Sequence, residues 1–435
     1  MAPARRSRLT AVLSALSLAT LTAVGSVLLA QSPSQPSEQA AADLPPGSSW
    51  VGSWGAALHE AGEADEIAPE GFTDVTLRQV ARLSLGGDAL RLRLSNVYGD
   101  RPLEIGAVTV AVRRGNQGRP RVDIVDLRRV TFDGQESTSI PVGEVLASDP
   151  VRVRVPDLAD VVVSMHLPGP TGPATWQASA FATSFVAEGE HVTDPGDAFE
   201  TLDESRYFLA GVDVATDDDD GTVVFVGDSI TAGANSSVDA DLRYPDQVAA
   251  RLLGGTAASA GSAGSTGPVG RCGVVNAGIG GNRVLSGSGR TGDPVLDRFD
   301  RDVLAVPGVR TVVVLAGIND IGGAEGDLEP EELIDAYRTL VDRARADGVR
   351  VIGATLTPFT GFGYATEAGE ADRQAVNDWI RSTDELDGVV DTDRVLRDPA
   401  DPARLRPSYD SGDSLHPSDE GFAAVAAAVA PALDC

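Results

Sequence analysis

Residues 222–235 read Thr-Val-Val-Phe-Val-Gly-Asp-Ser-Ile-Thr-Ala-Gly-Ala-Asn. A short β-branched, apolar run ends abruptly in Gly227, Asp228 and Ser229. Such a run predicts a buried strand that leads into a turn, and this turn presents one hydroxyl group. A serine hydroxyl is a weak nucleophile and needs a neighbouring base. The stretch therefore directs attention to histidine and acidic residues elsewhere in the chain.

A matching base and acid lie near the other end of the chain. His416 is the only histidine after residue 221, and Asp413 precedes it by three residues. In a helical or turn conformation this spacing places the carboxylate beside the imidazole. The carboxylate can then accept the Nδ1 proton and leave Nε2 facing Ser229. Pro417 suits a first helical turn, so we expect His416 at the cap of the last helix. These residues predict a serine hydrolase.

After residue 221, apolar strand-like runs alternate with helical patterns. We expect strands at 222–226, 273–276, 311–316, 349–356 and 388–391, and helices near 244–253, 294–304, 330–346, 370–382 and 418–430. This alternation predicts a parallel sheet that helices cover on both faces. Sites in such sheets form at the carboxyl ends of the strands. Topology therefore brings Ser229 and His416 together although they are far apart in sequence.

Two further segments follow predicted strands and offer hydrogen-bond donors. Residues 276–282 end in a glycine run with Gly280 and Gly281, and Asn319 follows the third strand. The backbone N–H of Gly281, the side-chain N–H of Asn319 and the backbone N–H of Ser229 predict an oxyanion hole. Alternatively, the glycine run is only a tight turn and Asn319 caps a helix. A second Gly-Asp-Ser-Leu at 412–415 follows no predicted strand and is not a second nucleophile.

These four segments together resemble the SGNH, or GDSL, hydrolase superfamily over residues 221–435. The resemblance implies a flavodoxin-like three-layer α/β/α domain without a metal or organic cofactor. It also implies Ser229 as nucleophile, His416 as base and Asp413 as its orienting acid, with Ser229, Gly281 and Asn319 as oxyanion donors. The second block leaves Gly280 as an alternative to Gly281. The Gly-x-Ser-x-Gly elbow of α/β-hydrolases does not frame Ser229, which argues against that fold.

The preceding region has a different pattern. Residues 90–94 and 151–155 alternate between apolar residues and arginine, and glycine-rich turn signals separate such runs. This pattern predicts an antiparallel β-sandwich domain over residues 48–215. The four aspartates at 217–220 are expected to form a solvated hinge before the second domain. A calcium site is the alternative, although it would need ligands from elsewhere.

Three segments of this first domain resemble secreted bacterial SGNH proteins of a xylan-esterase-like branch. They are residues 50–54, residues 76–79 (Thr-Leu-Arg-Gln) and residues 93–99 (Arg-Leu-Ser-Asn-Val-Tyr-Gly). The resemblance implies acyl groups on polysaccharide as substrate. Three tryptophans of this domain could form a sugar-binding platform or pack in the core, and we favour the core. They are Trp50, Trp54 and Trp176.

Charge and the N-terminus bear on partners and location. The formal net charge is −29, which disfavours nucleic acid and anionic lipid as partners. Residues 1–30 combine a basic start with an apolar run and predict a secretory signal, and residues 31–47 predict a flexible linker. An uncleaved membrane anchor is the alternative. We expect a secreted protein, without stable membrane insertion after cleavage.

The chain has two cysteines, Cys272 and Cys435. In a doubly wound domain, strand starts and helix ends share the edge of the sheet opposite the catalytic edge. Cys272 precedes the strand at 273–276 and Cys435 follows the helix at 418–430, so both belong to that edge. An exported protein can oxidise them, and we expect one disulfide. Two unpaired thiols are the alternative.

We therefore expect a secreted carboxylic ester hydrolase that forms an acyl-enzyme, acting on O-acyl groups of carbohydrates. Two rival interpretations are a lipase or lysophospholipase, and a glycan-binding protein with a vestigial hydrolase domain. An exposed apolar surface over the site would favour a lipase. The sequence does not determine the acyl length, the alcohol or the oligomeric state.

Overall fold

The computed structural model describes residues 48–62, 65, 67–113, 120–121, 127–217, 220–254, 271–323 and 328–435. All of them belong to one compact unit, Glu38–Cys435. The expected signal peptide at 1–30 and linker at 31–47 lie outside the described residues, so both remain predictions, as do the domain boundaries. Among the helices described, none has the length and apolar character needed to cross a bilayer.

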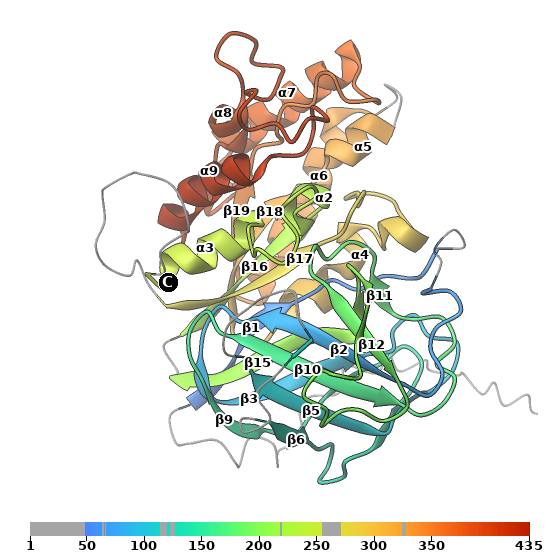
Figure 1. Ribbon diagram of the computed structural model, residues 1–435. Coiled ribbons are helices and arrows are strands. Elements are labelled where there is room, and N and C mark those ends of the chain that lie inside the picture. Colours follow the sequence, from blue (N-terminus) through green and yellow to red (C-terminus); the bar gives the residue numbers. More distant parts are fainter. Residues whose placement is uncertain are drawn as a thin grey trace, which may run out of the picture. The chain divides into compact units, whose positions relative to one another are not determined.

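The region before residue 218 consists of antiparallel sheets, as predicted (Figure 1). One sheet has the order β1 (Ser48–Gly55), β15 (Leu209–Asp217), β3 (Gly87–Ser95) and β8 (Val145–Ala147), and β9 (Val151–Val155) also pairs with β3. The other has the order β13 (Glu200–Asp203), β12 (Ser184–Glu188), β2 (Val75–Arg82), β10 (Asp160–Leu167), β5 (Ala107–Val112) and β6 (Arg128–Val130). Side chains of both sheets, such as Leu92 of β3 and Val163 of β10, share one core, which is the packing of a β-sandwich.

Two short strand pairs complete this region. They are β4 (Leu103–Ile105) with β7 (Thr138–Ile140), and β11 (Trp176–Gln177) with β14 (Arg206–Tyr207). The alternating run in β3 places its leucines in the core, as expected. Its arginines, however, do not face solvent: Arg91 and Arg93 bind the two carboxylate oxygens of the fully buried Asp213 at 2.9 and 3.0 Å. A buried carboxylate is tolerated here because two guanidinium groups compensate its charge.

The acidic segment after the sandwich is not simply a solvated hinge. Asp217 is the last residue of β15 and pairs with Ser48 of β1. Asp220 accepts a hydrogen bond from the hydroxyl of Thr216 at 2.6 Å. Asp218 and Asp219 lie outside the described residues. Within the described ranges, no group of histidine, cysteine and acidic side chains is arranged to hold a metal ion.

The sheet formed after residue 220 is parallel throughout and has the strand order β17, β16, β18, β19, β20. Its strands are β16 (Gly221–Gly227), β17 (Cys272–Gly278), β18 (Val309–Leu315), β19 (Arg350–Ala354) and β20 (Gly388–Val390). Numbered from the first strand, this order is 2-1-3-4-5, the order of flavodoxin-like folds. The predicted α/β architecture is confirmed.

Helices cover both faces of this sheet, and every residue of its central strand β16 is therefore buried. Val224 and Val226 pack with α4 (Val295–Phe299), α6 (Pro330–Ala346) and α7 (Glu367–Ser382) on one face. Val223 and Phe225 pack with α3 (Tyr244–Leu252) and α9 (Asp419–Val429) on the other. The shorter helices are α2 (Ser229–Ala232), α5 (Ile318–Gly323), α8 (Thr392–Leu396), η2 (Gly289–Thr291) and η4 (Ala430–Ala432).

Two local predictions differ from the structure. The helix expected at 294–304 is α4 followed by a π-helical turn, η3 (Asp300–Leu304). Pro417 does not lie in the first helical turn of the last helix, because Ser418 is its N-cap and accepts a hydrogen bond from the Gly421 N–H. His416 therefore precedes the cap and belongs to the loop.

The β-sandwich covers the edge strand of the parallel sheet. Strand β1 lies against β17, and the N–H of Val274 in β17 donates to Ser84 Oγ at 2.8 Å. Glycine is required at the closest approach, since a Cβ atom at Gly273 would lie 2.0 Å from the carbonyl oxygen of Gly52. An exposed edge strand invites pairing with other chains, and this contact closes that edge.

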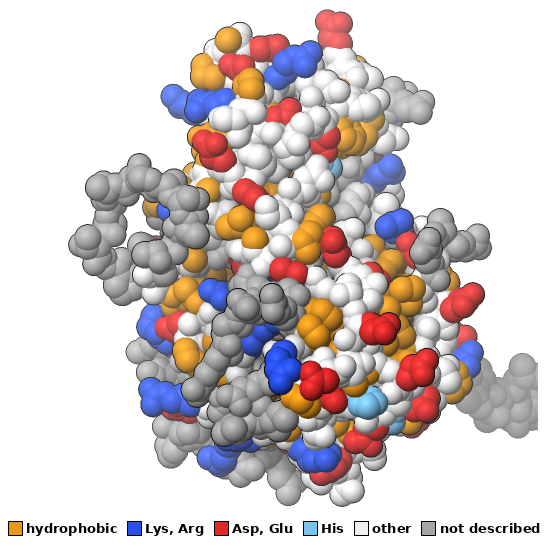
Figure 2. All heavy atoms as spheres, viewed as in Figure 1, with side chains coloured by type: hydrophobic (Ala, Val, Ile, Leu, Met, Phe, Trp, Pro, Cys, Tyr) orange, Lys and Arg blue, Asp and Glu red, His pale blue; other side chains and the backbone are white. Residues whose placement is uncertain are grey.

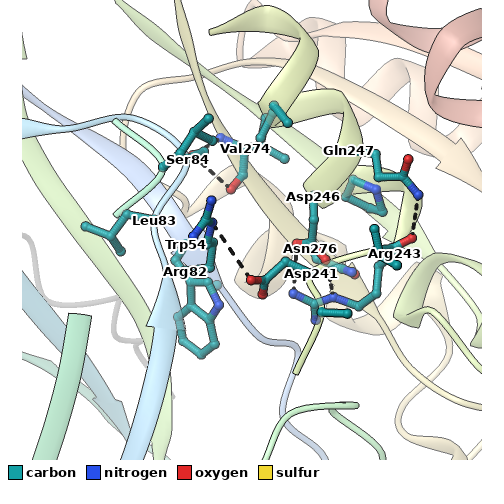
Figure 3. Close-up of a pocket in the computed structure, with 17 residues that line it drawn as sticks. Trp54, Arg82, Leu83, Ser84, Asp241, Arg243, Asp246, Gln247, Val274 and Asn276 are labelled. Carbon is teal, nitrogen blue, oxygen red and sulfur yellow. Dashed lines mark hydrogen bonds and ion pairs between the residues drawn. The ribbon is translucent and has the colours of Figure 1, made fainter. Parts of the chain in front are cut away.

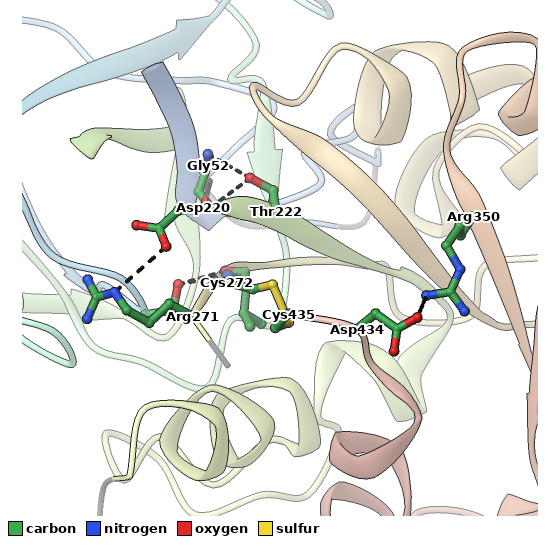
Figure 4. The surroundings of a disulfide bond; sticks show 10 residues. Gly52, Asp220, Thr222, Arg271, Cys272, Arg350, Asp434 and Cys435 are labelled. Atoms are coloured by element: carbon green, nitrogen blue, oxygen red, sulfur yellow. Dashed lines mark hydrogen bonds and ion pairs between the residues drawn. A yellow bond between two sulfur atoms is a disulfide. The ribbon is translucent and has the colours of Figure 1, made fainter. Parts of the chain in front are cut away.

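Cys272 and Cys435 form the predicted disulfide, with 5.4 Å between their Cα atoms (Figure 4). Cys272 is the first residue of β17, and Cys435 follows η4 after α9. The bond therefore lies at the start of β17, whereas Gly280 and Gly281 follow the end of this strand.

Candidate active site

Ser229 and His416 meet at the carboxyl end of β16. The side chain of Asp228 caps α2 by accepting from the Ile230 N–H at 2.9 Å, which places Ser229 at the first helical position. His416 Nε2 lies 2.8 Å from Ser229 Oγ, and His416 Nδ1 lies 2.6 Å from Asp413 Oδ2. With the imidazole proton on Nδ1, the histidine donates to the carboxylate and accepts from the serine hydroxyl. The structure thus brings the three predicted residues into one hydrogen-bonded chain.

A compact turn holds Asp413 in this position. Its Oδ1 atom accepts from the backbone N–H groups of Leu415 and His416 at 2.9 and 2.8 Å. Burial acts to raise the pKa of Asp413, but the hydrogen bonds from the His416 ring and from these N–H groups outweigh burial and lower this pKa. The carboxylate is therefore charged at neutral pH, which suits it to hold an imidazolium.

Asn235 also contacts the orienting acid, and sequence reasoning did not find this. Its side-chain amide donates to Asp413 Oδ2 at 3.0 Å and to Ser411 Oγ at 2.9 Å. Its backbone has a φ of +66°, a left-handed conformation that asparagine adopts more readily than most residues. An Asn six residues after the serine was the available signal, although nothing in the sequence linked it to Asp413.

The expected oxyanion donors belong to the segments that follow three neighbouring strands, β16, β17 and β18. The Ser229 N–H opens a helix and therefore has no acceptor within that helix. Gly281 has a φ of +72°, where a side chain would be strained. The Asn319 amide donates through Nδ2 to the Asn282 carbonyl at 3.0 Å and accepts at Oδ1 from Tyr364 at 3.1 Å. Both contacts fix which way the amide points and leave one N–H of Nδ2 available.

An aromatic loop after β19 borders this arrangement. The Phe362 ring lies edge-on to the His416 ring, with 6.2 Å between centroids and 88° between planes. Tyr364 packs against Phe362 at 4.6 Å and holds Asn319 through its hydroxyl. The sequence Phe-Thr-Gly-Phe-Gly-Tyr at 359–364 follows a strand end, which is the signal that could have pointed to this loop.

Two buried carboxyl groups, those of Asp228 and Asp320, are next in sequence to Ser229 and Asn319. Burial raises the pKa of Asp228 to about 7 and that of Asp320 to about 6. Asp320 accepts from the backbone N–H groups of Val284 and Leu285, and it thereby anchors the chain just after Gly281. Both residues belong to the motifs that the sequence displayed, yet their neighbours Ser229 and Asn319 were the ones singled out.

A separate cavity of about 160 Å³ lies between the sandwich and α3 (Figure 3). Trp54, Arg82, Asp241, Arg243 and Asn276 are among the residues that line it, whereas Ser229, Asp413 and His416 are not. Its charged groups pair with one another, for example Arg243 with Asp246 at 2.6 Å and Arg82 with Asp241 at 3.8 Å. The cavity is therefore distinct from the hydrogen-bonded chain at Ser229.

The tryptophans favour the core interpretation over a sugar platform. Trp54 and Trp176 are each 5% exposed. Trp176 stacks on Tyr207 with 6.0 Å between ring centroids, and the guanidinium of Arg91 covers the Trp50 ring at 4.6 Å. Rings that are packed in this way present little area to a glycan.

Known proteins resemble the second half of the chain. Residues 225–424 match the GDSL-like lipase/acylhydrolase family, and no curated protein matches the chain. A GDSL-like lipase from Bacteroides thetaiotaomicron is 21% identical over 48% of this chain and 85% of its own, with a TM-score of 0.35. An acetyl xylan esterase from Geobacillus stearothermophilus is 22% identical over 48% of this chain and 92% of its own, with a TM-score of 0.35. A family two carbohydrate esterase from Cellvibrio japonicus is 13% identical over 89% of this chain and 94% of its own, with a TM-score of 0.34.

The family match covers the segment in which Ser229, Asn319, Asp413 and His416 lie. Residues 225–424 form a GDSL-like lipase/acylhydrolase domain, and the chain is an ester-hydrolysing enzyme.

Proposed function

We propose that the chain hydrolyses carboxylic esters through an acyl-enzyme formed on Ser229. The observation that carries this proposal is the chain of hydrogen bonds from Asp413 through His416 to Ser229, at 2.6 and 2.8 Å. A hydroxyl so placed is activated when the imidazole takes its proton.

In the first half-reaction Ser229 Oγ attacks the ester carbonyl carbon while His416 Nε2 accepts the hydroxyl proton. The carbon–oxygen bond to the alcohol then breaks, and His416 returns that proton to the leaving alkoxide. In the second half-reaction His416 removes a proton from water, which attacks the acyl carbonyl carbon. The bond from that carbon to Ser229 Oγ then breaks, His416 returns the proton to Oγ, and the acid is released. Asp413 keeps the imidazole in the productive tautomer and stabilises its charged form throughout.

The negative charge on the carbonyl oxygen would be held by the backbone N–H groups of Ser229 and Gly281 and by Asn319 Nδ2. Donors fixed before the reaction stabilise this charge without reorganisation. The amide of Asn319 is fixed by Asn282 and Tyr364, which supports its assignment. Gly281 is preferred to Gly280 because its left-handed backbone marks it as the position where the loop turns.

For the substrate we propose an O-acyl carbohydrate, processed outside the cell. The resemblance of residues 50–54, 76–79 and 93–99 to xylan-esterase-like proteins supports the alcohol, and the signal-like residues 1–30 support export. The surface gives the lipase alternative little support: among the described residues, the exposed large apolar side chains are Val142, Val238 and Val389. On the face in Figure 2, acidic and basic side chains are scattered among apolar and uncharged ones.

Ser229→Ala tests the mechanism, with Ser414→Ala of the second Gly-Asp-Ser as matched control. We expect Ser229→Ala to lower kcat by roughly 10⁴-fold or more with unchanged folding, because removing one hydroxyl at the start of α2 disturbs little packing. Ser414→Ala should retain near-normal turnover. Substantial ester hydrolysis by folded Ser229→Ala would disprove the mechanism.

The substrate needs a separate assay. Nitrophenyl esters of increasing acyl length, acetylated xylan and phospholipid should be compared with the same enzyme preparation. Release of acetate from xylan, without phospholipid cleavage, is the expected result. Preference for phospholipid would establish the lipase alternative. Binding to xylan without release of acid would point to a vestigial hydrolase domain.

A further inference from the structure

The β-sandwich touches the loop that carries Gly281, the segment 279–294, and the strand end before it. Gln177 donates to the carbonyl of Gly278 at 3.3 Å. Asp65 pairs with Arg290 at 3.2 Å. The Tyr98 hydroxyl donates to the carboxylate of Asp293. Tyr98 belongs to residues 93–99, a segment that resembles xylan-esterase-like proteins but has no role in the proposed catalytic steps.

The Tyr98 contact is well defined. Arg301 donates to the Tyr98 hydroxyl at 2.9 Å, lies over its ring at 5.3 Å and reaches the Asp293 carboxylate at 3.2 Å. Burial raises the pKa of Tyr98 above its ordinary value, so the phenol keeps its proton and can donate. The carboxylate of Asp293 is thereby held between a hydroxyl and a guanidinium.

From Asp293 the contacts lead to the oxyanion donors through one side chain. The amide of the fully buried Asn282 donates to the carbonyl oxygens of Asp293 and Thr291 at 2.8 and 2.6 Å. The carbonyl of Asn282 accepts from Asn319 Nδ2 at 3.0 Å. Because Asn282 directly follows Gly281 and contacts Asn319, its position constrains both residues that are proposed as oxyanion donors.

Arg298 locks the same residue to the two strand ends. Its guanidinium is fully buried and donates to Asn282 Oδ1 twice, at 3.1 and 2.9 Å. The other three donors reach the carbonyls of Ala277 and Gly227 and the carboxylate of Asp302, at 2.8, 3.0 and 3.0 Å. All five N–H donors of the side chain are therefore used. Gly227 lies two residues before Ser229, so one rigid cluster joins the nucleophile turn to the oxyanion loop.

We propose that Tyr98 is a positioning residue, through which the β-sandwich holds Asp293, Asn282 and the oxyanion loop in their reactive geometry. The inference rests on the proposed function, since it assigns Gly281 and Asn319 as oxyanion donors. It gives the N-terminal region a part in the chemistry: the sandwich supports the active site of its neighbour. The hydroxyl of Tyr98 itself touches neither substrate nor triad.

Tyr98→Phe is the informative change because it removes one hydroxyl and keeps the ring beneath Arg301. Tyr207→Phe is the matched control. Tyr207 is also a sandwich tyrosine whose hydroxyl donates to an aspartate, Asp203, but both partners lie within the sandwich. Any general effect of removing a buried tyrosine hydroxyl should appear in both variants.

Three readouts separate positioning from mere stability: kcat, KM, and the inhibition constant of a boronic acid that forms a tetrahedral adduct with the serine. An adduct of this kind places a negative oxygen where the reacting oxyanion forms. For Tyr98→Phe we expect kcat about tenfold lower and boronic acid binding weaker by a similar factor, with KM nearly unchanged. Tyr207→Phe should change none of the three.

Asp293→Asn provides a second route to the same loop and should reproduce the loss in kcat. Circular dichroism of each variant reports the folded fraction, by which kcat is corrected. Wild-type kcat and boronic acid binding in folded Tyr98→Phe, alongside an inactive Ser229→Ala, would overturn the inference and leave the proposed function intact. A loss of kcat that disappears on correction for folded fraction would also overturn it. Activity in folded Ser229→Ala would instead remove the proposed function itself.

Discussion

The disulfide between Cys272 and Cys435 should protect the fold against heat without affecting the chemistry. The two cysteines are 163 residues apart, so the bond closes a long loop in the unfolded chain. For a loop of this length the chain-entropy model gives a stabilisation of about 5 kcal/mol. Exported proteins keep such bonds oxidised, so the value applies to the protein in its expected location.

The structure indicates why activity at room temperature should persist without the bond. Cys272 starts β17, and Ser229 follows the opposite end of the neighbouring strand β16. The C-terminus has other contacts: Leu433 is buried in the core between α3 and α9, and Asp434 pairs with Arg350 (Figure 4). Reduction therefore removes a constraint on the unfolded chain and leaves the native contacts of α9 in place.

The assay compares oxidised and reduced wild type by calorimetry, because reduction changes no side-chain volume. With an unfolding entropy of about 2.1 cal/mol/K per residue and roughly 390 residues, a loss of about 5 kcal/mol lowers Tm by about 6 °C if the unit unfolds cooperatively. A Cys272→Ala/Cys435→Ser double variant should behave like the reduced protein. At 25 °C, kcat should be unchanged in all three samples.

Any one of three results would contradict this prediction. A Tm that is the same within 1 °C in oxidised and reduced protein would show that the bond constrains nothing. A fall in kcat at 25 °C on reduction, with the folded fraction unchanged, would show that the disulfide edge is coupled to the catalytic edge. Two thiols found by alkylating the denatured, unreduced protein would mean that the bond does not form.

Two further predictions concern protons. Because hydrogen bonds keep the pKa of Asp413 below its ordinary value of 3.8, ionisation of this carboxyl group should not contribute to the pH dependence of kcat/KM near neutral pH. The serine mechanism needs no metal ion, so a chelator should not lower activity; inhibition by a chelator that zinc reverses would contradict the mechanism. Burial raises the pKa of Asp228 from 3.8 to about 7, so the stability due to its protonation is present at low pH and lost as the pH rises through about 7. From pH 4 to pH 8, the difference in unfolding free energy between Asp228→Asn and wild type should therefore change by up to about 4 kcal/mol in favour of the variant. Urea denaturation at several pH values measures this difference. A difference that stays constant across the range would refute the assignment.

The sequence sufficed for the parallel sheet because its signals are local. The run 222–226 is apolar and β-branched, and the spacing of apolar residues in 330–346 is helical, so each element could be identified alone. The strand order then followed from the family resemblance, and β16 to β20 adopt it. Pro417 was misjudged because it lies one residue before the cap, Ser418, and local patterns do not fix an element boundary to one residue.

In the candidate site, too, some residues are marked by a local motif and others are not. Ser229, Asp413 and His416 stand in short motifs, so their meeting at 2.6 and 2.8 Å could be anticipated from topology. Asn235 lacks such a motif, because its contact with Asp413 depends on a left-handed turn. Arg91 and Arg93 alternate with leucine, but this alternation does not reveal their ion pairs with Asp213 of the neighbouring strand β15. Long-range partners of this kind leave no periodic trace in a sequence.

The contacts at Arg298 and Tyr98 bear on why the sandwich and the hydrolase domain occur in one chain. An oxyanion hole works because its donors are fixed before the charge appears, and a loop such as 279–294 needs support to remain fixed. In this protein the support comes partly from Arg298 inside the hydrolase domain and partly from Tyr98 outside it. The sandwich also covers the edge of β17, the strand that leads into this loop. The same interface thus closes an exposed sheet edge and holds the segment on which catalysis is proposed to depend.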